Sequence, residues 1–171
     1  KTQKRRAKTN PPSTSGEAVT ATGGNQATTV DGATPLLIAA EKGYAKVVKM
    51  LLDHDGINAN QARTSGATPL LIACCYGHRE IAELLLAGGA DINQARTGGA
   101  TPLFIACQEG HRATVELLLV RGALIDQATQ RGSTPLFVAC YEGHNETAEL
   151  LLARGSDINQ AMTDGATPLF I

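Results

Sequence analysis

The sequence predicts an all-α protein, a helical solenoid of stacked helix-turn-helix-hairpin repeats. The first observation is a Thr-Pro-Leu motif that recurs at intervals of 34, 33, 33 and 33 residues, beginning at Thr34, Thr68, Thr101, Thr134 and Thr167. A fixed period of this length is typical of helical repeat arrays. The second observation is a helical spacing of apolar residues after each copy, and the third is a polar, glycine-containing run before the next copy. Repeats of this kind bury their apolar faces against each other.

Each Thr-Pro-Leu predicts the start of a short helix, here called helix A. The Thr hydroxyl can cap the helix, and Pro fits the first helical position, where no backbone donor is needed. A glycine follows seven residues after the Leu and suits the left-handed conformation that ends a helix. These glycines are Gly43, Gly77, Gly110 and Gly143. We therefore expect helix A to have about two turns.

A second helix, helix B, is expected directly after each of these glycines. Its apolar residues follow the i, i+3, i+4 spacing of one helical face, as in Ile81, Leu84 and Leu85 or Thr114, Leu117 and Leu118. A further row at i, i+4 widens this face, at Val48 and Leu52, Ala82 and Leu86, Val115 and Leu119, and Ala148 and Leu152. Helix B should therefore have neighbours on both sides.

A glycine after helix B and a polar run such as residues 90–99 predict a projecting hairpin turn. With Gly-x-Thr-Pro-Leu, Gly-His and Leu-Leu-x-x-Gly-Ala-Asp-Ile-Asn in register, residues 29–171 closely resemble the ankyrin repeat family. The resemblance implies an ankyrin-type solenoid that binds proteins on a concave face made by the hairpins and the ends of helix A. The family usually has His after Thr-Pro-Leu, where this chain has apolar residues, namely Leu37, Leu71, Phe104, Phe137 and Phe170.

The repeat period predicts four full repeats at 29–62, 63–95, 96–128 and 129–161, followed by the truncated start of a fifth at 162–171. The first repeat carries one extra residue near Asp53–Gly56, in a loop where insertions are tolerated. Residues 1–28 are rich in Thr, Gly, Pro and Ser, which predicts a disordered basic and polar linker. The basic cluster at residues 4–8 is interpreted as part of a solvated tail, with a nuclear import signal as the alternative. Since the sequence begins at Lys1 rather than Met and stops inside a predicted helix, we expect it to be a piece of a longer protein.

Charge and hydrophobicity narrow the classes of partner. Residues 29–171 carry ten basic and fifteen acidic side chains, a net charge of −5, which argues against nucleic-acid binding. No apolar run approaches the roughly 18 residues of a membrane span, and the basic N-terminus lacks the apolar segment of a signal peptide. We therefore expect no membrane insertion and an intracellular protein, cytoplasmic rather than nuclear.

The cysteines and histidines are interpreted as structural. Cys74, Cys107 and Cys140 share one repeat position, but helices in a stack lie about 8 to 10 Å apart, whereas a disulfide needs Cα atoms within roughly 7 Å and zinc needs converging thiolates. Packing is the better interpretation. Likewise His78, His111 and His144 all follow the glycine between helices A and B. No motif of a metalloenzyme, a redox dithiol or a phosphate-binding loop is present, so we predict no catalytic residue, metal, cofactor or small-molecule substrate.

Candidate binding residues emerge from comparing the repeats with each other. Framework positions hardly change, whereas hairpin tips and the ends of helix A vary, either because they bind a partner or because exposed surfaces drift freely. Within this variable set, Tyr76 and Tyr141 are predicted to be two aromatic anchors in a mixed-charge groove. The candidate partner-binding residues are Arg63, Cys75, Tyr76, Arg96, Gln108, Glu109, Arg131, Tyr141 and Glu142.

The predicted function is that of a protein-protein interaction scaffold, monomeric, which binds another protein of unknown identity. A groove with aromatic anchors and both charges suits an extended or helical peptide that carries apolar residues flanked by charge. The alternative hypothesis is a spacer or autoregulatory segment of a larger multidomain protein, an enzyme or a channel.

Overall fold

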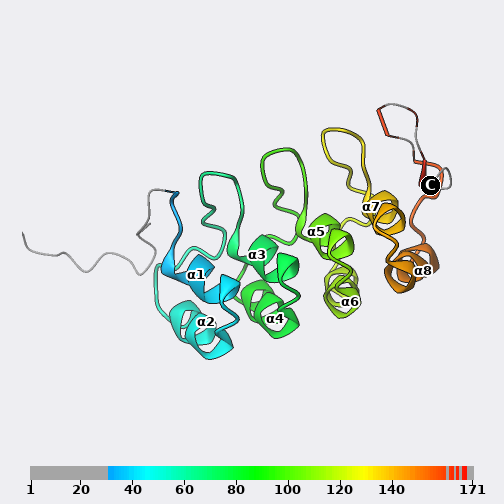
Figure 1. Cartoon of the computed structure of the whole chain (residues 1–171). Helices are drawn as coiled ribbons and strands as arrows, with labels where there is room; N and C mark the ends of the chain where they lie inside the picture. Colours follow the sequence, from blue (N-terminus) through cyan, green and yellow to red (C-terminus); the bar gives the residue numbers. More distant parts are fainter. Residues whose placement is uncertain (1–30, 161, 164, 166, 169–171) are drawn as a thin grey trace, which may run out of the picture.

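The computed structural model describes residues 31–160, 162, 163, 165, 167 and 168. This part of the chain forms a row of helix pairs with a hairpin between one pair and the next (Figure 1). The predicted linker 1–28 lies outside the described residues, and so does most of the predicted fifth helix A, including Phe170. In chain order the helices are α1 (Pro35–Glu41), α2 (Ala45–Leu52), α3 (Pro69–Cys75), α4 (Arg79–Ala87), α5 (Pro102–Gln108), α6 (Arg112–Val120), α7 (Pro135–Tyr141) and α8 (Asn145–Ala153).

The predicted start and end of helix A are confirmed in α1, α3, α5 and α7. Each has seven residues, begins with Pro, and is capped by the preceding Thr, whose buried hydroxyl accepts the N–H of the residue three positions on. In α5 this bond runs from the Phe104 N–H to Thr101 Oγ1 over 3.1 Å. The glycines that follow have positive φ angles between 68° and 76°, which only glycine adopts without strain.

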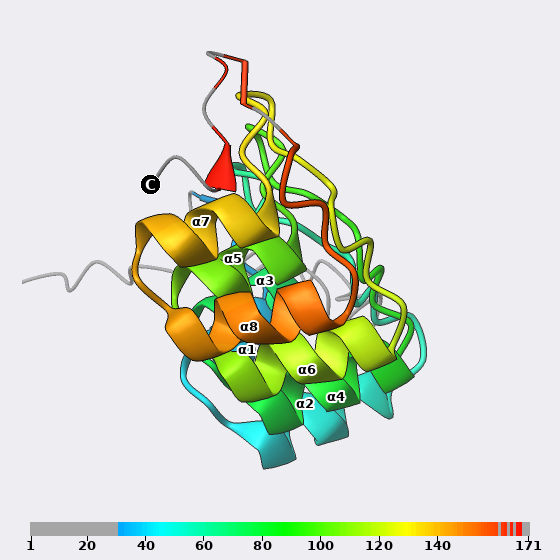
Figure 2. The ribbon, with the colours of Figure 1, turned by 90° about the vertical axis from the view of Figure 1, so that its right-hand side faces the viewer.

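The helices form two layers, with α1, α3, α5 and α7 in one and α2, α4, α6 and α8 in the other (Figure 2). Each helix packs against its own pair partner and against its neighbours in the same layer. The predicted apolar face of helix B is buried at Ile81, Leu85 and Leu118. The second row is buried at Val48, Ala82 and Val115, and its leucines are half-buried where another helix pair follows. Leu152 in α8 is 43% exposed, because no described helix follows α8.

Cys74 and Cys107 confirm the packing interpretation, since both side chains are completely buried in the layer of helix A. All four cysteines are free thiols. Burial raises the pKa of the Cys74 and Cys107 thiols far above the ordinary range, and a neighbouring thiol raises each further. Both therefore stay protonated at neutral pH.

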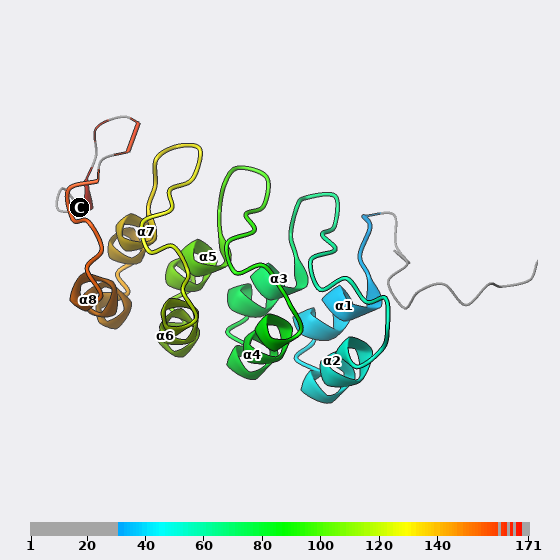
Figure 3. The same cartoon turned by 180° about the vertical axis from the view of Figure 1, so that it is seen from behind.

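The predicted hairpins project from one side of the row (Figure 3). Each closes on itself, as in the bond from the Arg96 N–H to the Ala100 carbonyl over 3.0 Å. Neighbouring hairpins are also joined, for example by the Gln130 N–H, which donates to the Gly98 carbonyl over 3.0 Å. A Cβ atom on Gly99 would lie only 2.9 Å from the Gln130 nitrogen, so glycine permits this close approach.

Two histidines confirm the structural interpretation by joining successive repeats. His111 Nε2 lies 3.0 Å from the Cys75 carbonyl oxygen, and His144 Nε2 lies 2.9 Å from the Gln108 carbonyl oxygen. A carbonyl can only accept, so Nε2 carries the proton in both rings. The preceding repeat makes room for the ring with its glycine, because a Cβ atom on Gly77 would lie 2.6 Å from His111 Nδ1.

A further set of hydrogen bonds between successive repeats joins the loops before the hairpins, and it was not predicted from the sequence. The side chains of Asn60, Asn93 and Asp126 lie at one repeat position and accept N–H groups of the next repeat. The shortest of these bonds runs from the Asp91 N–H to Asn60 Oδ1 over 2.7 Å. Their 33-residue spacing was the signal that could have revealed them.

The described helices have between seven and nine residues, and none of them has the length and apolar character needed to cross a membrane.

Candidate partner-binding face

The candidate binding residues lie on two elements of each repeat, the hairpin and the end of helix A. We call this surface the hairpin face, defined by residues 63–67, 96–100 and 129–133 together with the last residue and the C-cap of α1, α3, α5 and α7. The most exposed candidates include Tyr76 and Tyr141, at 52% and 65%. Arg96, Glu109, Arg131 and Glu142 are also exposed, and Arg63, Cys75 and Gln108 are half-buried.

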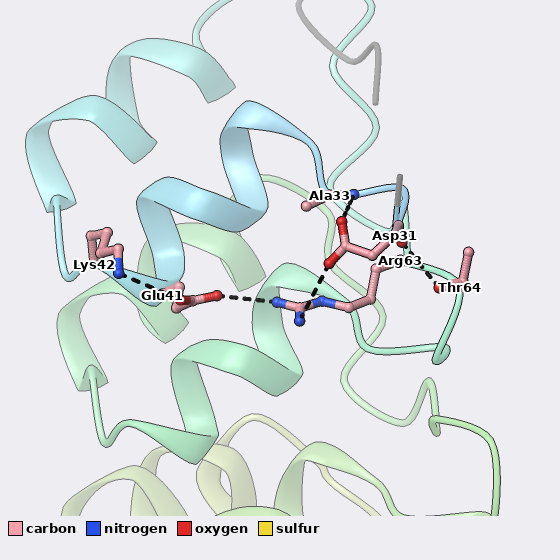
Figure 4. Close-up of polar contacts among 6 residues, drawn as sticks. All are labelled: Asp31, Ala33, Glu41, Lys42, Arg63 and Thr64. Atoms are coloured by element: carbon pink, nitrogen blue, oxygen red, sulfur yellow. Dashed lines mark hydrogen bonds and ion pairs between the residues drawn. The ribbon is translucent and has the colours of Figure 1, made fainter. Parts of the chain in front are cut away.

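Arg63 is engaged by carboxylates of its own chain (Figure 4). Its Nη2 atom donates to Glu41 Oε2 over 3.1 Å, and its Nη1 atom lies 3.9 Å from Asp31 Oδ2. The Arg63 side chain is only 23% exposed. A partner carboxylate would have to displace these contacts, so the structure makes Arg63 less accessible than the sequence pattern indicated.

Cys75, Arg96 and Glu109 come together although they belong to three different segments. Cys75 is the last residue of α3, Arg96 lies on the next hairpin, and Glu109 caps α5. The pKa of the Cys75 thiol is raised, chiefly by partial burial and then by the Glu109 carboxylate, while the Arg96 guanidinium acts in the opposite direction. Three residues of the predicted set thus lie close enough for the two charged groups to act on the thiol.

Two adjoining hollows lie on the hairpin face. The first has a volume of about 500 Å³ and is lined on one side by Arg96, Phe104 and Gln130. The second has a volume of about 480 Å³ and is lined by Gln108, Phe137, Val138, Tyr141 and Glu142. They share three lining residues, Arg131, Ser133 and Met162.

The two tyrosines have different surroundings because they occupy different repeat positions. Tyr141 is the last residue of α7, equivalent to Cys75 and Gln108, whereas Tyr76 is the C-cap of α3, equivalent to Glu109. The Tyr141 ring stacks on Phe137, with centroids 6.4 Å apart, and lines the second hollow. The Tyr76 ring stacks on His78, with centroids 6.0 Å apart. A role for both rings as partner anchors stays a prediction.

Several lining residues, among them Phe104, Ser133, Phe137 and Met162, were not predicted as binding residues. Phe104 and Phe137 occupy the position where the resemblance leads one to expect His, and that departure was the available signal. Ser133 and Met162 gave none, because each reaches the hollows through the packing of one hairpin on the next.

A family model described as ankyrin repeats (three copies) matches residues 17–96 and 89–162. A search of curated proteins finds no match.

Proposed function

The chain belongs to the ankyrin-repeat family, and from this premise we propose that it binds a protein partner on the hairpin face. Ankyrin repeats are generally protein-protein interaction modules. The observation that supports this face is the contrast between constant and variable positions. The capping Thr and the following Pro are the same in every repeat, whereas the last residue of helix A differs in all four. Two of these residues, Gln108 and Tyr141, line one of the hollows.

The framework suits recognition by side chains because its backbone is fixed before binding. Thr caps fix the helix starts, histidines join the helix pairs, and backbone hydrogen bonds join the hairpins. A preorganised surface loses little entropy on binding. Specificity then depends on which side chains each repeat places on the hairpin face.

The proposed protein is a monomeric, intracellular and non-catalytic module, cytoplasmic rather than nuclear. Ankyrin folds are typically not catalytic. Free thiols at all four cysteines are expected in a reducing compartment. The buried, protonated thiols of Cys74 and Cys107 are poor nucleophiles, because the thiolate is the reactive form.

The test uses residues 1–171 immobilised as bait for a random peptide library displayed on phage. Selected peptides are then titrated into the isotope-labelled chain, and backbone amide shifts are recorded. We expect the largest shifts on the hairpin face. Shifts confined to α2, α4, α6 and α8, or a selection that yields no binding peptide, would contradict the proposed function and favour a spacer role.

A further inference from the structure

The arginine at the first position of a hairpin is paired with a carboxylate in one repeat and, among the described residues, unpaired in the next. Arg63 is the paired one. Arg63 lies at the first position of its hairpin and faces Glu41, the last residue of α1. The two form an ion pair of 3.1 Å, and Asp31 adds a second carboxylate at 3.9 Å. The first repeat thus provides the acid that pairs with the arginine at the start of the second repeat (Figure 4).

Arg96 occupies the same hairpin position one repeat later, and its N–H donates to the Ala100 carbonyl as the Arg63 N–H donates to the Ala67 carbonyl. The residue equivalent to Glu41 is now Cys75, the last residue of α3. Its neutral thiol cannot pair with a guanidinium as a carboxylate does. Among the residues that the structure describes, Arg96 forms no ion pair and its side chain donates no hydrogen bond.

The hollow beside Arg96 has a basic rim. Among the described residues that line it, the charged ones are Arg96 and Arg131, and none carries a carboxylate. Arg131 likewise forms no ion pair with a described residue. Phe104, which is 7% exposed, provides an apolar surface in the same hollow. The adjoining hollow adds the rings of Phe137 and Tyr141.

We propose that this basic hollow receives an Asp or Glu side chain of the partner, and that an adjacent apolar side chain of the same partner segment enters the hollow beside Tyr141. The partner carboxylate then pairs with Arg96 from the hollow, as Glu41 pairs with Arg63 within the chain. Arginine binds carboxylates with two parallel donors, which favours this pairing over one with a neutral group. The inference rests on the proposed function and names the chemistry of the segment that is bound.

The test compares the wild-type chain with two variants in which the Arg96 guanidinium is either deleted or paired within the chain. Arg96→Gln deletes its charge, and Cys75→Glu supplies an internal carboxylate at the position from which Glu41 pairs with Arg63. Peptides selected from the phage library on wild type should share an Asp or Glu beside an apolar residue. In calorimetric titrations each variant should bind these peptides at least about tenfold more weakly.

Two matched variants serve as controls. Cys75→Ser keeps a small neutral side chain and should bind more tightly than Cys75→Glu. Arg112→Gln removes an exposed arginine of α6 outside the hairpin face and should bind within about twofold of wild type. Thermal unfolding checks whether each variant is folded. If Cys75→Glu is unfolded, the result for Arg96→Gln decides the test. Affinity of the wild type should also fall with added salt more steeply than that of Arg96→Gln.

The outcomes separate this inference from the proposed function. Peptides that bind the hairpin face without an acidic residue in common, or whose affinity is unchanged in Arg96→Gln, would overturn the acidic preference and leave the binding function standing. Peptides that bind elsewhere on the chain, or the absence of any selected peptide, would overturn both.

Discussion

One repeat position shows how a single residue changes the chemistry of the hairpin face. It is the last residue of helix A and holds Glu41, Cys75, Gln108 and Tyr141 in successive repeats. Glu41 forms an ion pair with a hairpin arginine, Cys75 forms none with the next one, and Tyr141 lines a hollow. The helix has the same length in all four cases, so the side chain at its last position decides how the following hairpin residue is paired.

Tyr141 and Tyr76 are expected to contact a partner through their exposed rings. Tyr141→Ala or Tyr76→Ala should weaken binding of a hairpin-face peptide by at least about 1 to 2 kcal/mol, because exposed aromatic rings are frequent binding hot spots. The melting curve should hardly change, since both rings are more than half exposed. Calorimetry and thermal unfolding measure the two effects separately. If both variants lost stability and kept affinity, the rings would only pack on Phe137 and His78.

Cysteine alkylation provides a second prediction from single residues. Iodoacetamide should modify Cys75 and Cys140 in the native chain, because both are half-buried, and modify Cys74 and Cys107 only after unfolding. Burial raises the pKa of all four thiols, so labelling of Cys75 should be slower than that of a free thiol and accelerate as pH rises. Mass spectrometry of digested protein identifies the sites. Native labelling of Cys107 as fast as that of Cys75 would contradict the packing of α5.

The start of helix A is specified by a capping motif in the sequence, whereas the start of helix B could be placed only from the glycine that precedes it. Thr101 and Pro102 specify a cap and a first turn by local chemistry alone. By contrast, the N-cap residue before α4, α6 and α8 is a His, and its side chain makes no capping hydrogen bond. Those rings bind carbonyls of the preceding repeat in two cases, a contact that depends on how repeats stack. The extra residue of the first repeat was located correctly, and α2 is one residue shorter than the other B helices.

Equivalent positions of α2 and α6 differ in burial, which yields a prediction about elements. Met50 in α2 and Leu117 in α6 lie at the same repeat position, but Met50 is 56% exposed and Leu117 is 5% exposed. The reason is that α6 packs between α4 and α8, whereas no described helix precedes α2. Leu117→Ala should lower the free energy of unfolding by about 2 to 5 kcal/mol, and Met50→Ala by less than about 1 kcal/mol. Urea unfolding measures both, and a larger loss for Met50→Ala would indicate that another segment covers that side of α2.

Three sets of hydrogen bonds join successive repeats along the whole row of helix pairs. Histidine bonds join the layer of helix A, Asn and Asp side chains join the loops after helix B, and backbone bonds join the hairpins. The binding surface could be predicted only in part. The variable positions followed from comparing the repeats, but the pairing of Arg63 with Glu41 and the adjoining hollows depend on contacts between residues 22 or more positions apart. Their geometry follows from stacking, which no single repeat specifies.

Leu118 tests the whole array because it lies completely buried in α6, which packs on α4, α5 and α8. Leu118→Ala should cost about 2 to 5 kcal/mol, through lost burial and the cavity left behind. Thr97→Ala, at an exposed hairpin tip, is the control and should cost less than about 0.5 kcal/mol. In a stack each repeat is stabilised by its neighbours, so amide exchange in the Leu118 variant should accelerate in α4 and α8 as well as in α6. Equal losses for the two variants in urea unfolding would contradict the repeat register, and acceleration confined to α6 would show that the helix pairs are not coupled.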